Sequence, residues 1–255
     1  MSAAAVHLAP RGRLGGFVRG VRVVTHAADA TPSYVRLPDG EVELVVRFLG
    51  PDVDAHVVGT RLQALHKGGP VVPPEAIAVR FKAGGAYPFF GVSMAALTDR
   101  LVSVDTLWGA DGARFRERVA EAATAAARVQ VIEDVLTARL QRGDLFEPAS
   151  APVVRRAIRS IETGSERSSV GALARSLGIS ERQLRRGFDD VVGMGPKAFA
   201  RVVRFQRALR AAARGTAPDW GAIAAATGYY DQAHLVGEVR RLTGTTPAAL
   251  LRAAR

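Results

Sequence analysis

The sequence lacks cysteine entirely. This absence excludes disulfide frameworks, zinc–thiolate sites, iron–sulfur clusters and cysteine nucleophiles. The sequence also lacks any run close to the roughly 18 apolar residues that cross a membrane, and its start, MSAAAVHLAPRGR, lacks the apolar centre of a signal peptide. We therefore expect a cytoplasmic protein with no membrane partner.

Aromatic residues are scarce at 6%, but hydrophobic residues make up 48% of the 255 positions. That share is sufficient for a sizeable core, which argues against a disordered chain. The length predicts one large domain or two small ones.

Positive charge is concentrated in the second part of the chain. Residues 1–150 hold 17 Lys and Arg against 16 Asp and Glu, whereas residues 151–255 hold 18 against 8. Nearly all of the net charge of +11 therefore belongs to the C-terminal two-fifths. This asymmetry is typical of a polyanion-binding module joined to a neutral one, although a solvated basic surface would produce the same count.

Short valine-rich segments dominate the first hundred residues. Four of them are predicted to be strands: 18–24, 41–50, 54–60 and 76–84. Turn formers such as Pro38-Asp39-Gly40 separate them, and strands at this spacing predict a small sandwich or barrel. From Asp111 to Arg142 the apolar residues recur at helical spacing and predict two helices, broken near 123–126.

An internal repeat lies in the basic part of the chain. SVGALARSLG at 169–178 aligns with DWGAIAAATG at 219–228 at an offset of 50 residues, and one extra residue in the second copy then raises the offset to 51. Glycines and apolar positions match along both copies: Gly178 with Gly228, Leu184 with Leu235, Phe188 with Val239, and Gly193 with Gly244. Such matches indicate two copies of one supersecondary unit.

Each copy predicts a short helix, a glycine turn and a second helix. In the first copy, Ser180 and Gln183 have the spacing of a capping box at the start of the second helix. Long polar side chains lie on the face opposite Leu184 and Phe188. This is the pattern of a helix-turn-helix, whose second helix enters the major groove, where arginine suits guanine and glutamine suits adenine. For one copy alone, an exposed helix that is merely basic is the alternative.

Three blocks of the basic part carry a family resemblance: ALARSLGISERQLRRGF, GMGPKAFARVVRFQRAL and AIAAATGYYDQAHLVGEVRRLTGTTPAAL. They resemble the DNA-binding domain of AraC/XylS-type transcriptional regulators, over about two-fifths of the chain. The resemblance implies seven helices, in which a long helix near 196–213 bridges two helix-turn-helix units. Less specifically, LPDGEVELVV, AVRFKAGGAYPFFGV, LTDR and LWG resemble the β-rich N-terminal domain of a little-characterised subgroup. In the wider family that position holds a cupin-like effector-binding barrel, followed by helices used in dimer contacts.

Two sets of DNA-binding residues follow. The residues expected to read bases are Arg182, Gln183, Arg185 and Arg186 in the first recognition helix, and Gln232 and His234 in the second. The residues expected to contact phosphates, and so to set affinity and salt dependence, are Arg155, Arg156, Arg204, Arg207, Arg240 and Arg241.

Three positions depart from the family pattern. Gly237 lies where the family often carries a larger reading residue, and Val239 replaces the usual phenylalanine. Gly187 places a glycine inside the first recognition helix, at a cost of about 1 kcal/mol relative to alanine. We therefore expect the second unit to hold the DNA backbone more than it reads sequence.

The histidines are the remaining candidates for metal chemistry. They are His7, His26, His56, His66 and His234, and no two of them form a closely spaced pair. His56 and His66 are near enough in sequence to meet across a hairpin, but surface or half-buried imidazoles are the preferred interpretation. No motif of a catalytic site is present, so we expect neither an enzyme nor a cofactor.

Together these observations predict an α+β protein. Its expected parts are a β-rich, cupin-like sandwich or barrel at 1–110, a helical hairpin and candidate dimer contact at 111–142, a linker at 143–152, and a double helix-turn-helix domain at 153–253. The expected function is a sequence-specific DNA-binding transcriptional regulator whose N-terminal domain responds to a small-molecule effector. Candidate partners are double-stranded DNA, the effector, RNA polymerase and a second copy of the chain. The alternatives are a cupin-like metal enzyme tethered to a DNA-binding domain and a ligand-free DNA-bound scaffold.

Overall fold

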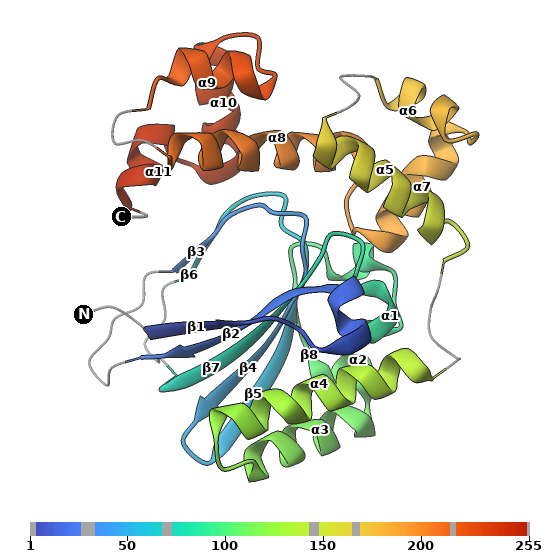
Figure 1. The fold of residues 1–255 in the computed structure, drawn as a ribbon, viewed down its shortest axis with the longest axis vertical. Coiled ribbons are helices and arrows are strands. Elements are labelled where there is room, and N and C mark those ends of the chain that lie inside the picture. The colour runs from blue at the N-terminus through green and yellow to red at the C-terminus, as the bar shows by residue number, and fades with distance from the viewer. Residues whose placement is uncertain are drawn as a thin grey trace.

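The computed structural model describes residues 4–26, 34–67, 73–142, 148–164, 169–214 and 218–253. A six-stranded antiparallel sheet occupies the N-terminal part, and a group of helices forms the C-terminal part. In Figure 1, α3 and α4 lie beneath the sheet and the C-terminal helices lie above it. The predicted α+β class is confirmed.

The N-terminal part contains eight strands and three short helical turns among the described residues. They are β1 (Ala4–Leu8), η1 (Gly12–Gly16), β2 (Val18–Thr25), β3 (Tyr34–Arg36), β4 (Glu43–Leu49), β5 (Asp52–Val58), β6 (Leu65–Lys67), β7 (Glu75–Phe81), α1 (Tyr87–Phe90), η2 (Met94–Leu97) and β8 (Leu101–Ser103). The main sheet has the order β1-β2-β7-β4-β5-β8, and β3 pairs with β6 in a separate two-stranded sheet. The predicted sandwich or barrel thus takes the form of one large sheet with a small one beside it.

Alternation along the strands explains which face of the sheet is buried. In β4, Leu44 and Val46 are fully buried, whereas Val45 and Arg47 are half-buried. Successive strand residues point to opposite faces, so the valine-rich pattern gives this strand one apolar face. The apolar face belongs to the same hydrophobic core as the buried residues of α3 and α4.

Three helices follow β8: α2 (Val104–Trp108), α3 (Ala110–Glu121) and α4 (Ala125–Gln141). The break falls between α3 and α4, where Thr124 caps α4 by accepting a hydrogen bond from the Ala127 amide. Within the predicted dimer contact at 111–142, Leu136 is 1% exposed in the chain's own core and Val135 is half-buried against it. Packing on the sheet therefore accounts for these apolar stripes, and the homodimer stays a prediction without their support.

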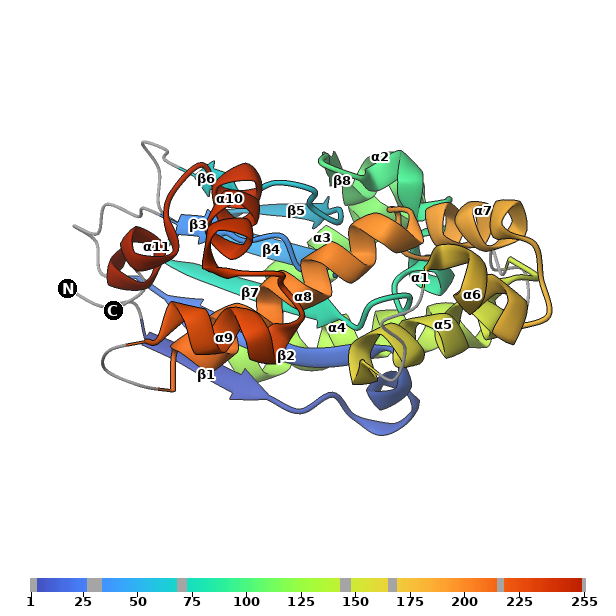
Figure 2. The same ribbon diagram turned by 90° about the horizontal axis from the view of Figure 1, so that it is seen from above.

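Seven helices make up the described C-terminal part, as the resemblance implied. They are α5 (Ala151–Thr163), α6 (Val170–Ser176), α7 (Glu181–Val191), α8 (Pro196–Ala212), α9 (Trp220–Thr227), α10 (Gln232–Thr243) and α11 (Pro247–Ala253). Figure 2 shows α8 running from α6 and α7 at one end to α9 and α10 at the other. Of the predicted linker, residues 143–147 lie outside the described residues, and α5 already begins at Ala151. In the described part, no helix has the length and apolar character to span a bilayer.

Two hydrophobic cores divide the molecule, and their boundary passes through α8. The larger core includes the sheet, α3 and α4, together with Phe188 of α7 and Phe199 of α8. The smaller core begins at Phe205 and contains the apolar residues of α9, α10 and α11. The first helix-turn-helix unit therefore shares a core with the N-terminal sheet, whereas the second has a core of its own.

Two turns of the N-terminal part pack closely against the C-terminal helices within the larger core. At Gly84, an added Cβ would lie 2.7 Å from Ile158 Cδ1 and 3.2 Å from Val191 Cγ1. At Gly40, it would lie 2.8 Å from the Phe199 ring. Since these distances leave no room for a side chain, the turns pack directly on α5, α7 and α8.

Candidate nucleic-acid interface

The sequence repeat reappears as repeated helix starts. Ser169 Oγ accepts from the Ala172 amide at 3.2 Å at the start of α6, and Asp219 Oδ1 accepts from the Ala222 amide at 3.0 Å at the start of α9. Each cap satisfies an amide that the first helical turn leaves unpaired. The two units therefore begin in the same way, 50 residues apart.

The turns of the two units also match. Gly178 and Gly228 have φ angles of +72° and +85°, a conformation that glycine adopts without steric cost. The residue after each glycine donates to a helix carbonyl: Ile179 N to Ala174 O at 3.1 Å, and Tyr229 N to Ala224 O at 3.0 Å. Two copies of one helix-turn-helix unit are thus present.

The first recognition helix, α7, begins at the predicted capping box. Ser180 Oγ accepts from the Gln183 amide at 3.2 Å, and Gln183 Oε1 accepts from the Ser180 amide at 2.9 Å. Leu184 and Phe188 are 0% exposed, which fixes the orientation of the helix. The opposite face is therefore turned to solvent.

All four reading residues predicted in this helix are exposed: Arg182, Gln183, Arg185 and Arg186. Arg185 forms an ion pair with Glu181 at 3.2 Å, so its guanidinium is partly engaged. The Gln183 carboxamide oxygen is engaged in the cap and leaves only its NH₂ group to donate. Arg182 and Arg186 consequently offer the least encumbered donors.

A close approach between helices accounts for Gly187, the glycine inside α7. An added Cβ would lie 2.8 Å from Val154 Cγ2 and 3.0 Å from Ser150 Cβ, on α5 and its N-terminal cap. Glycine lowers the helix propensity of α7 at this position, but it allows α5 and α7 to pack closely.

The second recognition helix, α10, presents a smaller polar face. Asp231 Oδ1 accepts from the His234 amide at 2.7 Å, and both Gln232 and His234 are exposed. His234 Nδ1 accepts from the Tyr230 amide at 3.3 Å, which leaves Nε2 as the outward donor of the neutral ring. An added Cβ at Gly237 would meet nothing within 4 Å, so packing does not exclude a larger residue there.

The predicted phosphate contacts fall into two groups. Arg156, Arg240 and Arg241 are exposed. Arg155 donates to the Tyr87 hydroxyl at 2.5 Å, and Arg207 donates to the Ile161 carbonyl at 3.0 Å. The geometry of these last two residues is that of structural contacts, and their role in phosphate binding stays a prediction.

Arg204 forms part of a buried polar cluster between α8 and α10. Its Nη2 donates to both carboxylate oxygens of Glu238, at 2.9 and 3.0 Å, and its guanidinium lies 4.6 Å from the Tyr229 ring centre. The Tyr229 hydroxyl donates to Glu238 Oε1 at 3.3 Å. Burial lowers the pKa of Arg204, but the hydrogen bonds that it donates to Glu238, the charge of Glu238 and the contact with Tyr229 together outweigh burial and raise the pKa overall. This geometry favours a role in fastening the second unit to α8 over the predicted phosphate contact.

Sequence reasoning missed Tyr230 as a candidate contact, although it belongs to the block that carries the resemblance. Its side chain is 92% exposed, immediately before the N-cap of α10. A bare aromatic hydroxyl beside a recognition helix can donate to a DNA phosphate. The signal available in the sequence was an aromatic residue outside the repeat's apolar pattern.

The N-terminal part contacts both recognition helices near their C-terminal ends. Ser93 Oγ donates to the Asp189 carbonyl at 3.4 Å, and Thr98 Oγ1 donates to the Gly193 carbonyl. The Ala64 amide donates to the Leu242 carbonyl at 2.7 Å, at the end of α10. The N-terminal halves, which carry the predicted reading residues, are exposed.

The histidines were the candidates for a metal site in the sequence. Among the described residues, no group of three or more His, Cys, Asp or Glu is placed to hold a metal ion. His56 Nδ1 lies 2.7 Å from Asp54 Oδ1. The His66 side chain lies outside the described residues.

Comparison with known families divides the chain in the same way. Residues 173–253 match the model of a helix-turn-helix domain. Residues 6–103 match a domain of unknown function (DUF6597).

Curated relatives match over part of their length. The probable bifunctional transcriptional activator/DNA repair enzyme AlkA of Mycobacterium tuberculosis is 40% identical over 99 residues, which are 38% of this chain and 20% of that protein. The probable thc operon regulatory protein of Rhodococcus erythropolis is 29% identical over 116 residues, 44% of this chain and 35% of that protein. The chain thus spans between a fifth and about a third of these relatives.

Solved structures of regulators are also similar. A probable AraC family transcriptional regulator from Rhodopseudomonas palustris is 29% identical, with a TM-score of 0.36, over 41% of this chain and 98% of that one. ToxT from Vibrio cholerae is 8% identical, with a TM-score of 0.47, over 99% of this chain and 98% of that one. Together with the repeated units, the family match identifies residues 173–253 as a helix-turn-helix domain of the AraC/XylS type.

Proposed function

We propose that this protein is a sequence-specific DNA-binding transcriptional regulator whose N-terminal domain responds to a small-molecule effector. The observation that carries the proposal is the pair of repeated units on α8, each with a recognition helix exposed at its N-terminal half. The concentration of positive charge in residues 151–255 supports the same conclusion, because DNA is a polyanion.

In the proposed mechanism, the two recognition helices enter successive major-groove segments on one face of the duplex. Arg182 and Arg186 would read bases, whereas Arg156, Arg240 and Arg241 would hold phosphates. The proposed protein partners are RNA polymerase and a second copy of the chain. Effector binding would change how the two units are held, since the N-terminal part contacts both.

The test is selection of genomic DNA fragments by the full chain at one fixed salt concentration, followed by affinity measurements on selected and scrambled duplexes. We expect Arg182→Ala and Arg186→Ala each to lower discrimination by about 1–3 kcal/mol, because each loses one arginine–base contact. Arg118→Ala, on the exposed surface of α3, is the matched control and should leave discrimination unchanged. Equal affinity of the full chain for selected and scrambled DNA would contradict the proposal.

A further inference from the structure

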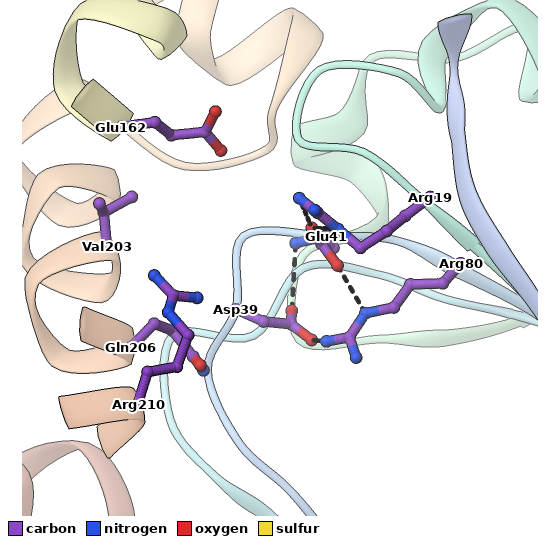
Figure 3. Close-up of a pocket in the computed structure, with 8 residues that line it drawn as sticks. All are labelled: Arg19, Asp39, Glu41, Arg80, Glu162, Val203, Gln206 and Arg210. Atoms are coloured by element: carbon purple, nitrogen blue, oxygen red, sulfur yellow. Dashed lines mark hydrogen bonds and ion pairs between the residues drawn. The ribbon is translucent and has the colours of Figure 1, made fainter. Parts of the chain in front are cut away.

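A pocket of about 340 Å³ lies between the N-terminal sheet and α8, lined from both sides (Figure 3). One wall belongs to the N-terminal part, with Arg19, Asp39, Glu41 and Arg80. The other belongs to α5 and α8, with Glu162, Val203, Gln206 and Arg210. The volume is within the range of small-molecule sites, at the small end of about 300–1,000 Å³.

Charges on the N-terminal wall are largely paired with one another. The Asp39 and Glu41 side chains are only 6% and 8% exposed. Arg80 forms ion pairs with both, and Arg19 donates to Glu41 at 2.5 Å. This wall is therefore a fixed polar surface.

The opposite wall carries two charges that the described residues leave unpaired. Neither the Glu162 carboxylate nor the Arg210 guanidinium forms a hydrogen bond or ion pair with the described part of the chain, and both residues are exposed. Figure 3 shows them on one wall, facing the side that carries Arg19 and Asp39. On the same wall, Gln206 donates through Nε2 to the Pro38 carbonyl at 2.6 Å, so its Oε1 can accept from a ligand.

The numbers of positive and negative side chains in the pocket indicate which class of ligand fits it. Three arginines and three carboxylates line it, so its formal charge is zero. An anion without a positive group would meet three carboxylates, and a cation without a negative group would meet three arginines. A ligand with both charges can place a carboxylate on Arg210 as a charge-assisted fork and an ammonium on Glu162.

We propose that this pocket binds a small zwitterion of the α-amino acid class, with its carboxylate on Arg210 and its ammonium on Glu162. Val203 supplies an apolar surface for a side chain.

The pocket lies where a ligand can act on DNA binding. Val203 belongs to the larger core and Phe205 to the smaller one, so α8 passes from one core to the other beside the pocket. Leu37, next to the Gln206 contact, packs against the smaller core. A ligand bound to Glu162 and Arg210 can therefore change the position of the second helix-turn-helix unit relative to the first. This step rests on the proposed function.

The experiment measures ligand binding to the full chain without DNA, by thermal shift and calorimetry. The probes are the twenty protein amino acids, each at millimolar concentration, with the corresponding amine and deaminated acid as matched controls. We expect at least one amino acid to raise the melting temperature, because a ligand that binds only the folded state stabilises it. The matched amine and acid should give no comparable shift.

Variants locate the site. Arg210→Ala and Glu162→Gln should each weaken binding about tenfold or more, since each removes one charge-assisted contact. Arg159→Ala, also exposed on α5 but outside the pocket, should bind as the unmodified chain does. Failure of every amino acid to bind, or equal binding of the deaminated acid, would overturn the inference. So would unchanged binding in both pocket variants.

DNA binding is measured separately on the same samples. Selective DNA binding without amino acid binding overturns only the ligand inference. Amino acid binding without selective DNA binding overturns the proposed function and leaves the pocket assignment in place. If the bound amino acid alters operator affinity in the unmodified chain and not in Arg210→Ala, the pocket is the regulatory site.

Discussion

Two glycines within the recognition helices have opposite surroundings. Gly187 in α7 is buried against α5, and Gly237 in α10 is exposed with open space around it. We expect Gly187→Ala to lower the free energy of unfolding by up to about 2 kcal/mol, because overpacking outweighs the helix-propensity gain. Gly237→Ala should raise it by up to about 1 kcal/mol, since propensity acts there alone. Thermal unfolding of the two variants checks the signs, and stabilisation by both would contradict the packing argument.

We expect the second helix-turn-helix unit to lose stability at alkaline pH because of Tyr229. Burial and the nearby Glu238 carboxylate raise the pKa of Tyr229 to about 12. An unfolded tyrosine ionises near pH 10, so the folded state holds this proton more tightly. The resulting stabilisation is complete below about pH 10 and is lost as the pH rises toward 12.

The measurement for Tyr229 is the melting temperature as a function of pH from neutral to strongly alkaline. Tyr229→Phe removes the titrating hydroxyl and should show a smaller decline across this window than the unmodified chain. Parallel declines in the two proteins would show that Tyr229 does not contribute to the pH dependence.

At the scale of single elements, the pair of α8 and α10 depends on Arg204. Among the described residues, its removal would leave Glu238, which is 7% exposed, with only the longer Arg201 contact at 3.7 Å and the Tyr229 hydroxyl. We expect Arg204→Ala to reduce stability by about 3 kcal/mol, because a buried carboxylate loses its principal partner. Hydrogen exchange should show the loss of protection in α9 and α10.

Arg241→Ala is the matched control for Arg204→Ala, since Arg241 is exposed on α10. We expect it to keep the stability of the chain and to lower the salt slope of DNA binding by about one. A stable Arg204→Ala protein with the lowered slope would restore Arg204 as a phosphate contact.

The elements differ in how far the sequence alone predicts them. The capping box at Ser180 and the turn at Gly178 were predictable because each forms between residues a few positions apart. Exposure of the predicted reading residues followed from the spacing of the buried Leu184 and Phe188. Local periodicity is sufficient for such features.

Contacts between distant residues were not predictable in the same way. The pair of Arg204 and Glu238 spans 34 positions, and the contact between Gln206 and Pro38 spans 168. The sequence predicts a phosphate contact for Arg204 because the residue type alone does not reveal the contact with Glu238. The role of Gly187 likewise depends on α5, which only the tertiary structure places beside it.

At the scale of the whole molecule, the shared core predicts unequal behaviour of the two units in isolation. A fragment from Pro148 onward keeps α5 but exposes the surfaces of Ile158, Val191 and Phe199 that the N-terminal turns cover. We expect this fragment to bind DNA weakly, with α7 losing far more amide protection than α10 relative to the full chain. Hydrogen exchange of both proteins is the measurement. Equal loss in the two helices would contradict the division into two cores.

The boundary of the cores within α8 has a consequence for modularity. In a modular regulator, an effector-binding domain and a DNA-binding domain could be exchanged independently at the linker between them. If the helices after residues 143–152 were replaced by those of another regulator, the N-terminal turns would lose the surface of α5 and α7 on which they pack. A graft between Val203 and Phe205 would keep that surface and replace only the distal unit. Under the proposed function, the half of an operator that α7 contacts would thereby be tied to the N-terminal part, whereas the half that α10 contacts would be free to change.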